Sequence, residues 1–247
     1  MILLKNNDQI KIIDYACKIV RDTLFYIEEQ IVPGVTTIDL DRMAEEFILS
    51  KGAIPGFKGL YGFPGTLCVS IEDEVVHGIP SERQLNEGEI ISIDVGSIYN
   101  EYYGDHAKTF PVGNINDDRL KLIDVTRKSL ELGINEVKSG KYIGDIGHAV
   151  QTYAEKNNFS VVKELVGHGI GKSLHEEPQI PNYGSMNTGP EIKVGMCMAI
   201  EPMLNQGSDK IITKEDGWTI STKDGKLSAH FEHTIAVTDE GVKILTV

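Results

Sequence analysis

Residues 88–96 read GEIISIDVG, a stretch that places an acidic residue inside an apolar β-strand. Alternation along a strand puts Ile91, Ile93 and Val95 on one face and Asp94 on the other. A carboxylate in such surroundings is costly unless it is paired with a cation or bound to a metal ion. A lone Asp in a strand is more often structural, so this stretch alone indicates no function.

The same pattern occurs three more times. Asp105 follows Asp94 by eleven residues, and a turn near residues 100–101 would bring both acids to one end of a hairpin. Glu201 lies in GMCMAIEPML and Glu232 in LSAHFEHTIAV, again among alternating apolar residues. Four ionised carboxylates repel one another in an apolar environment, so their convergence predicts bound cations. Such oxygens with one imidazole suit Mn, Fe(II), Co or Zn in a bridged pair that activates water for hydrolysis.

Seven histidines supply the candidate imidazoles. His168 lies in VGHGIG, where flanking glycines allow a sharp turn or a close backbone approach. His175 follows seven residues later, and His77 in HGIP matches His168 in HGIG. Less is expected of the remaining four: alternation turns His106 and His233 away from the acids that they follow, His148 lies in a helix, and the role of His230 is left open.

The order of predicted elements indicates two similar halves. Helices are predicted at about 8–31 (N-cap Asp8), 36–52 (N-cap Thr36 or Thr37), 117–137 and 142–157, and strands at 67–71, 89–98, 102–112, 196–203, 218–221, 228–238 and 242–246. Short similarities support a repeat, such as PGVTTIDL (33–40) with SGKYIGDI (139–146). We expect an α/β (α+β) chain forming a single catalytic domain over 1–247. Its halves, about 8–112 and 117–240, would face one shared cleft.

Composition narrows the class of protein. The net charge is −13, with 37 acidic against 24 basic residues, which argues against phosphate-driven binding to nucleic acid or anionic membranes. The three cysteines, Cys17, Cys68 and Cys197, are odd in number and widely spaced, so no disulfide framework is indicated. The first apolar stretch is too short for a signal peptide, and no apolar run approaches the roughly 20 residues of a membrane span. A soluble, cytoplasmic protein is expected.

Six stretches together resemble the type I methionine aminopeptidases, which are pita-bread metallopeptidases: VHGIP (76–80), SIDVGSIYNEYYGDHAKTF (92–110), GHGIGKSLHEEP (167–178), MAIEPML (198–204), DGWTISTKDGKLSAHFEHT (216–234) and TDEGVKILT (238–246). The resemblance spans nearly the whole chain. It implies the pita-bread fold, in which two halves related by a pseudo-two-fold axis form a curved antiparallel sheet covered by helices. It also implies removal of the initiator methionine from nascent proteins when the second residue is small.

The resemblance further implies a ligand set for two divalent ions, with Co, Mn, Fe(II) or Zn as candidates. Asp94 would bind one ion, Asp105 and Glu232 would bridge both, and His168 and Glu201 would bind the other. Glu201 would also accept a proton from the attacking water. A monovalent cation, Na or K, would lie near Ser228 and the backbone of Ser92 and Val95.

Substrate contacts follow from the same resemblance. His77 would contact the scissile amide nitrogen, and His175 would hydrogen-bond the carbonyl oxygen as it becomes an oxyanion. The methionine side chain would lie against four residues: Phe63, Cys68, Leu174 and Trp218. Three departures from the family pattern affect this part of the site. Leu60 stands where an aromatic residue is usual, Leu174 replaces a frequent Phe, and Ser70-Ile71-Glu72-Asp73 replaces Ser-x-Asn-Glu.

Two alternatives remain at this point. The X-Pro peptidases, such as aminopeptidase P and prolidase, share the site but carry a large additional N-terminal domain. A non-catalytic peptide-binding module of the same fold would lack metal ligands, whereas all five are present here. The expected partner is the N-terminus of a peptide or nascent chain, and the protein is expected to act as a monomer. Transient contact with the ribosome is left open, and neither membrane binding nor direct nucleic-acid recognition is expected.

Overall fold

The computed structural model describes residues 1–247 and contains four α-helices and fifteen strands. The helices are α1 (Asn7–Glu28), α2 (Thr37–Ser50), α3 (Asp117–Asn135) and α4 (Ile143–Lys156), with one 3₁₀ turn at Leu60–Gly62. The strands are β1 (Ile54–Pro55), β2 (Leu67–Ile71), β3 (Glu74–Val76), β4 (Ile90–Tyr99), β5 (Tyr102–Pro111), β6 (Ser160–Val161), β7 (Gly167–Gly169), β8 (Glu176–Ile180), β9 (Cys197–Ile200), β10 (Met203–Asn205), β11 (Ile211–Thr213), β12 (Ile220–Thr222), β13 (Ser228–His230), β14 (His233–Thr238) and β15 (Gly241–Ile244).

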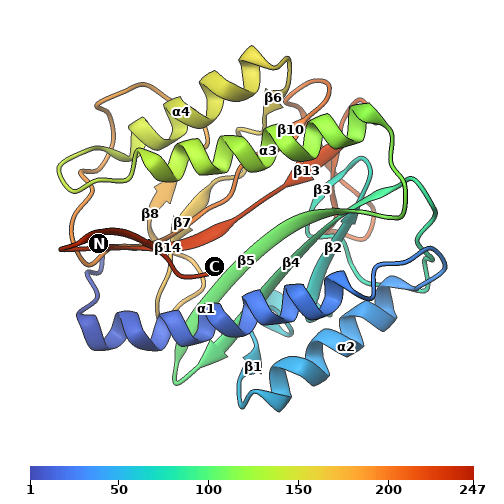
Figure 1. Ribbon diagram of the computed structural model, residues 1–247, viewed down its shortest axis with the longest axis horizontal. Coiled ribbons are helices and arrows are strands. Elements are labelled where there is room, and N and C mark those ends of the chain that lie inside the picture. Colours follow the sequence, from blue (N-terminus) through green and yellow to red (C-terminus); the bar gives the residue numbers. More distant parts are fainter.

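Two helices followed by a set of strands occur twice along the chain, and all the strand pairings are antiparallel. Strand β4 pairs with β1, β2 and β5, and the largest sheet has the order β15-β14-β9-β7-β8. Helices α1 and α2 lie over the β4–β5 side in Figure 1, whereas α3 and α4 lie over the side that carries β7, β8 and β14. The mixed helix and strand class predicted from the sequence is confirmed.

The helix starts follow from local capping. Asn6, and not the predicted Asp8, is the N-cap of α1. Its side chain accepts from the backbone N–H groups of Asp8 and Gln9, and the Gln9 side chain accepts from the backbone N–H of Asn6. The prediction of Asp8 was wrong because Asn and Asp both cap helices well, and Asn6 lies only two residues earlier. Thr36 caps α2 by accepting from the backbone N–H of Asp39.

Two predicted strands are interrupted. The stretch 196–203 forms β9 and β10 with a break at Glu201 and Pro202, and 228–238 forms β13 and β14 with a break at Phe231 and Glu232. The expectation that both glutamates lie within continuous strands was therefore wrong. Proline has no backbone N–H to donate to a ladder, which accounts for the first break. Both glutamates thereby project from chain segments that change direction.

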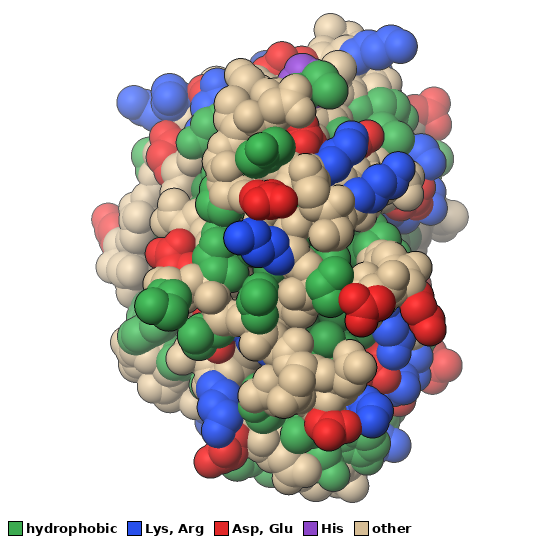
Figure 2. Space-filling view, turned by 90° about the vertical axis from the view of Figure 1, so that its left-hand side faces the viewer, with side chains coloured by type: hydrophobic (Ala, Val, Ile, Leu, Met, Phe, Trp, Pro, Cys, Tyr) green, Lys and Arg blue, Asp and Glu red, His purple; other side chains and the backbone are tan.

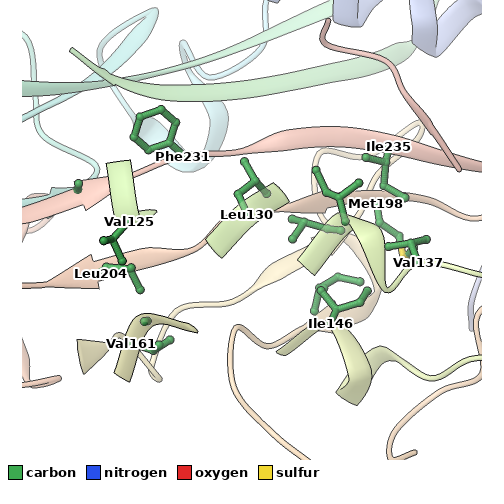
Figure 3. Close-up of a cluster of buried hydrophobic side chains, with 14 of the residues drawn as sticks. Val125, Leu130, Val137, Ile146, Val161, Met198, Leu204, Phe231 and Ile235 are labelled. Carbon is green, nitrogen blue, oxygen red and sulfur yellow. The ribbon is translucent and has the colours of Figure 1, made fainter. Parts of the chain in front are cut away.

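Each half has its own apolar core. One cluster joins α1 and α2 to β2, β4 and β5, and the other joins α3 and α4 to β9, β10 and β14. Figure 3 shows the second cluster, in which Val125 of α3 lies beside Leu204 of β10, and Leu130 of α3 and Ile146 of α4 lie toward Met198 of β9. Burial of these helix faces is the main force that holds each pair of helices on its sheet.

The two halves meet along β5 and the β13–β14 segment, which lie next to each other in Figure 1. The Thr234 hydroxyl donates to the carbonyl of Asp105 at 2.7 Å, and the backbone N–H of Glu232 donates to the carbonyl of Ala107 at 2.9 Å. The Thr109 hydroxyl donates to the carbonyl of His230 at 2.8 Å. This seam fixes the position of one half relative to the other.

Basic and acidic side chains are interspersed on the face shown in Figure 2, with hydrophobic side chains between them. Many of the charges on the molecule form ion pairs on or between surface elements, such as Lys108 with Glu28 and Lys58 with Glu45. None of the helices is both long enough and apolar enough to cross a bilayer.

Close packing of α1 on β5 leads to a stability prediction. A Cβ atom at Gly104 would lie 2.5 Å from the carbonyl carbon of Ala16 and 2.6 Å from the nitrogen of Cys17, both in the α1 backbone. We expect Gly104→Ala to lower the free energy of unfolding by about 1–3 kcal/mol, because the helix must move away from the strand. Urea denaturation measures this change, and a stability equal to that of the parent protein would contradict the packing described here.

Candidate metal centre and substrate cleft

The β4–β5 hairpin carries two of the predicted ligands. Asp94 faces Ala107 and Gly96 faces Asp105 in the ladder, so the two carboxylates are diagonal neighbours on the same face of the sheet. The turn between the strands has positive φ at Asn100 and Glu101, 44° and 68°, as a tight two-residue hairpin requires. The hairpin register thus brings the two acids together, as their spacing predicted.

The two strand breaks of the second half bring in the glutamates. Glu232 is docked on β5 at both of its backbone groups, because its N–H donates to Ala107 and its carbonyl accepts from Nδ1 of His106 at 2.5 Å. The carbonyl of Glu201 accepts from Nδ2 of Asn182 at 3.0 Å. Their side chains are therefore fixed from the backbone, opposite the aspartates of the first half.

His168 comes from β7 and faces the same acids. Its Nδ1 lies 3.0 Å from the carbonyl of Gly169, which can only accept, so Nδ1 carries the proton. Nε2 then presents its lone pair, 3.6 Å from Oδ2 of Asp105 and 3.5 Å from Oε1 of Glu201. Ligand atoms of Asp105, His168 and Glu232 all lie within 4.8 Å of one another. A lone pair among carboxylates is suited to bind a cation and cannot donate to them.

The acids of this cluster have no protein cation beside them. No Lys or Arg is among the residues that line the cleft. Oδ1 of Asp94, Oδ1 of Asp105 and Oε1 of Glu232 are buried and accept no hydrogen bond. Buried oxygens of this kind are rare unless an ion or a water satisfies them. The donor set, oxygen with one imidazole nitrogen, fits divalent ions of the Mn, Fe, Co or Zn type.

Burial and mutual repulsion shift the protonation of the whole cluster. Burial raises the pKa of Asp105 to about 7. Burial, reinforced by the neighbouring charge of Asp105, raises the pKa values of Asp94, Glu201 and Glu232 well above their usual range. Burial, together with the nearby His175, lowers the pKa of His168 to about 4, so this imidazole is neutral at physiological pH. Without metal, the folded protein therefore retains protons on its carboxylates near neutrality.

All eleven residues predicted for the site line one cleft of about 610 Å³, which is partly open to solvent. Its apolar wall contains Phe63, Cys68, Leu174 and Trp218, and the rings of Phe63 and Trp218 meet edge to face with centroids 5.2 Å apart. The acids and His168 form the opposite, polar part of the lining. Trp218 is only partly buried and is held by Asp216, whose carboxylate accepts from the Trp218 backbone N–H at 2.8 Å.

Two further histidines stand exposed at the mouth of the cleft. The ring of His175 meets that of His168 edge to face, with centroids 4.5 Å apart. His77 has a left-handed backbone (φ 60°) and precedes Gly78, where a Cβ would lie 1.9 Å from the carbonyl oxygen of Val69. Both side chains reach the surface, but the walls of the cleft partly desolvate the imidazoles, and this desolvation lowers the pKa of both. The nearby His175 adds to the effect on His77. Both are therefore neutral donors near pH 7.

Sequence reasoning missed two residues that line the cleft, and it left open one buried residue that does not line it. Phe57 and Tyr61 line it together with Leu60, which the sequence analysis noted only as a departure. His230, whose role was left open, is fully buried, and its Nε2 has no hydrogen-bond partner and lies 3.7 Å from Oε2 of Glu201. Its predicted place on the same strand face as Glu232 was the available signal, although β13 ends at His230 and Glu232 lies beyond it.

Other predicted features lie outside the cleft. The rings of His106 and His233 stack on each other at 4.8 Å, and neither lines it. His148 lies on α4. The side chain of Glu72, in the segment that departs from the family pattern, accepts from the Ile90 backbone and pairs with Arg119 of α3. Glu72 therefore links the two halves of the chain at a place outside the cleft.

Comparison with known proteins gives a consistent result. The model of Metallopeptidase family M24 matches residues 11–239. Methionine aminopeptidase 1 of Bacillus subtilis (strain 168) is 53% identical over 246 residues, covering 100% of this chain and 99% of the relative. The crystal structure of methionine aminopeptidase from Rickettsia prowazekii superposes with a TM-score of 0.98 at 42% identity over the whole of both chains. Prolidase from Pyrococcus furiosus shares the fold with a TM-score of 0.79 at 22% identity, covering 99% of this chain and 65% of its own. The expected pita-bread fold is thereby confirmed.

The raised pKa values predict that metal binding releases protons. Protons and divalent ions compete for the same oxygens, so affinity should fall as pH decreases from 8 to 6, through the pKa of about 7 of Asp105. Calorimetric titration of the metal-free protein with Mn²⁺ at pH 7, in two buffers of different ionisation enthalpy, measures the protons released. Asp8→Asn, at an exposed acid, should leave this number unchanged. Equal heats in both buffers would contradict the prediction.

Proposed function

Because the chain belongs to metallopeptidase family M24 and, within it, to the methionine aminopeptidases, we propose that its cleft removes the initiator methionine from nascent proteins whose second residue is small. The chain is a metallopeptidase hydrolase that acts on peptide N-termini. One observation carries the proposal: Asp94, Asp105 and Glu232, from both halves of the chain, each have a buried carboxylate oxygen without a partner and line one cleft with His168. Ligand atoms of Asp105, Glu232 and His168 lie within 4.8 Å of one another. Bound cations would neutralise such a group in its ionised form and satisfy its oxygens.

Five residues would hold two divalent ions in this cluster: Asp94, Asp105, His168, Glu201 and Glu232. Divalent ions bound there supply Lewis-acid activation of water and of the scissile carbonyl. Co, Mn, Fe(II) and Zn all suit the donor set. The protein's contribution is to fix the ligands in position, which the backbone bonds of Glu232 and Glu201 support.

Glu201 is the proposed acceptor of the proton that the attacking water loses. Its carboxylate lies beside His168 on one side and His230 on the other, at 3.5 and 3.7 Å. Burial raises its pKa well above the ordinary range, which makes this carboxylate a stronger base than a glutamate in water. Its position at a strand break lets the side chain reach the acids of the first half.

The exposed histidines are proposed to handle the peptide bond. His175, at the mouth, would donate from its imidazole N–H to the carbonyl oxygen as negative charge develops there. His77 would contact the scissile amide nitrogen from the opposite half of the chain. Both imidazoles are neutral near pH 7, and a neutral imidazole can still donate one hydrogen bond.

The apolar wall is proposed to select methionine. An unbranched thioether packs well against aromatic rings, and Phe63 and Trp218 present such a pair. Leu174 closes the wall where a larger aromatic is frequent in the family, so the pocket has more room at that point. Phe63, Cys68 and Leu174 also belong to an apolar cluster with α1, so the wall is continuous with the core.

Several finer features belong to the same proposal. The three cysteines are free and buried, which suits a reducing compartment such as the cytoplasm. The nascent chain is the proposed partner of a monomeric enzyme. A monovalent cation, Na or K, is proposed near Ser228, Ser92 and Val95. The Ser228 hydroxyl donates to Oδ1 of Asn205 at 2.9 Å, which leaves the lone pairs of its oxygen available to a cation.

Peptide assays test the activity. With Mn²⁺, Fe(II) or Co²⁺ added to metal-free protein, we expect release of methionine from Met-Ala-Ser and negligible cleavage of Met-Pro or Ala-Pro dipeptides. Hydrolysis confined to the X-Pro peptides would favour a prolidase-type enzyme. Stoichiometric metal binding without cleavage of any of these peptides would favour a non-catalytic module.

Replacement of the two neighbouring histidines should separate metal binding from turnover. His168→Ala removes a proposed ligand and should weaken metal affinity by more than about 100-fold and nearly abolish turnover. His175→Ala should keep metal affinity and lower kcat by about 10²–10³-fold, because its proposed bond strengthens in the transition state. Calorimetry and steady-state kinetics measure the two effects. Full activity of either variant would count against its assigned role.

A further inference from the structure

The first six residues form an N-terminal arm that packs on the second half of the chain. The backbone N–H of Lys5 donates to the carbonyl of Gly195 at 2.7 Å, and Nζ of Lys5 donates to the carbonyl of Leu3 at 3.0 Å. Nζ also forms an ion pair with Oε2 of Glu176 at 2.5 Å. The arm thus ends in a charged contact with the residue that directly follows His175.

This ion pair is unusually well buried. The side chains of Lys5 and Glu176 are 5% and 8% exposed, whereas every other pair between Lys or Arg and an acid has at least one side chain that is 20% exposed or more. Removal of one partner from a buried pair leaves the other charge without compensation. The pair therefore fixes both side chains more firmly than a surface contact would.

Two glycines leave the space that the pair needs. A Cβ at Gly171 would lie 2.4 Å from Oε1 of Glu176 and 2.7 Å from Cε of Lys5. A Cβ at Gly195 would lie 2.9 Å from the carbonyl oxygen of Lys5. Gly171 is the last glycine of the GHGIG motif, so the motif that carries His168 is also shaped around the arm.

Glu176 holds both ends of the segment that enters the cleft. Its Oε1 accepts from the backbone N–H of Ser173 at 3.3 Å, and the carbonyl of Ser173 accepts from the N–H of Gly171 at 3.2 Å. Between Ser173 and Glu176 lie only Leu174, in the apolar wall, and His175, at the mouth. An exposed side chain keeps a precise position only when the residues beside it are fixed.

We propose that Lys5 is a positioning residue, which acts through Glu176 to hold His175 and Leu174 in the cleft. The proposal rests on the function proposed above for its readout in turnover. The N-terminal arm is then part of the working site, although it contributes no atom to the cleft. An arm that served only to fasten the chain end would affect stability without depending on His175.

The test is a double-mutant cycle between Lys5 and His175. Lys5→Met removes the charge and keeps an unbranched stem, and Lys11→Met makes the same change at an exposed pair with Asp8. We expect Lys5→Met to lower kcat for Met-Ala-Ser by about 10–100-fold, as other outer-shell changes do, with metal affinity within about twofold of the parent. Lys11→Met should leave kcat unchanged. In a His175→Ala background, Lys5→Met should lower kcat no further.

Two measurements keep the test decisive. Glu176→Gln retains an oxygen that can accept from the backbone N–H of Ser173, and it should lower kcat less than Lys5→Met does. Thermal unfolding shows whether each variant is folded at the assay temperature. In ¹³C-labelled, metal-free protein, the imidazole resonance of His175, identified by its loss in His175→Ala, should shift in Lys5→Met and stay in place in Lys11→Met.

An equal loss of kcat with and without His175, or an unshifted His175 resonance in folded Lys5→Met, would overturn the positioning role. Failure of the function has a different signature, because the parent protein would then release no methionine while the resonance still responded to Lys5→Met.

Discussion

Repulsion among buried carboxylates is the constraint on which this structure depends. Asp94, Asp105, Glu201 and Glu232 converge without a Lys or Arg beside them, and each is held at a raised pKa by burial. A group of this kind is unstable in its ionised form unless cations neutralise it. The acids come from both halves, so they meet only when the seam between β5 and the β13–β14 segment is complete. The proposed set of ligands is therefore complete only in the folded chain.

The cleft has two chemically different sides, and this asymmetry sets what it can recognise. The acidic side with His168 suits cations and a polar peptide end, whereas the wall with Phe63 and Trp218 suits an apolar side chain. A substrate that satisfies both needs an apolar residue next to a free terminus, which is how a peptide beginning with methionine presents itself. A substrate of this kind agrees with the metallopeptidase family and with the fold of the chain.

Prediction from sequence succeeded where the relevant physics is local. Alternation in GEIISIDVG and the eleven-residue spacing from Asp94 to Asp105 gave the β4–β5 hairpin and its two acids. Prediction failed at the strand breaks, where alternation continues through Glu201 and Glu232 although the ladder does not. Pro202 marked the first break. The second has no comparable local mark, because Glu232 leaves its strand to bond with Ala107 of the other half.

The sequence by itself determined the helix and strand order, the repeat of that order, and the set of acids and imidazoles, because periodicity and motif spacing are properties of the chain alone. Only the tertiary structure decided that Phe57 and Tyr61 line the cleft. It also placed His230, whose role the sequence left open, beside Glu201, and it brought Lys5 to Glu176, 171 residues away in the chain. These contacts join segments far apart in the chain. Their formation depends on how the two halves pack, which no local pattern of residues records.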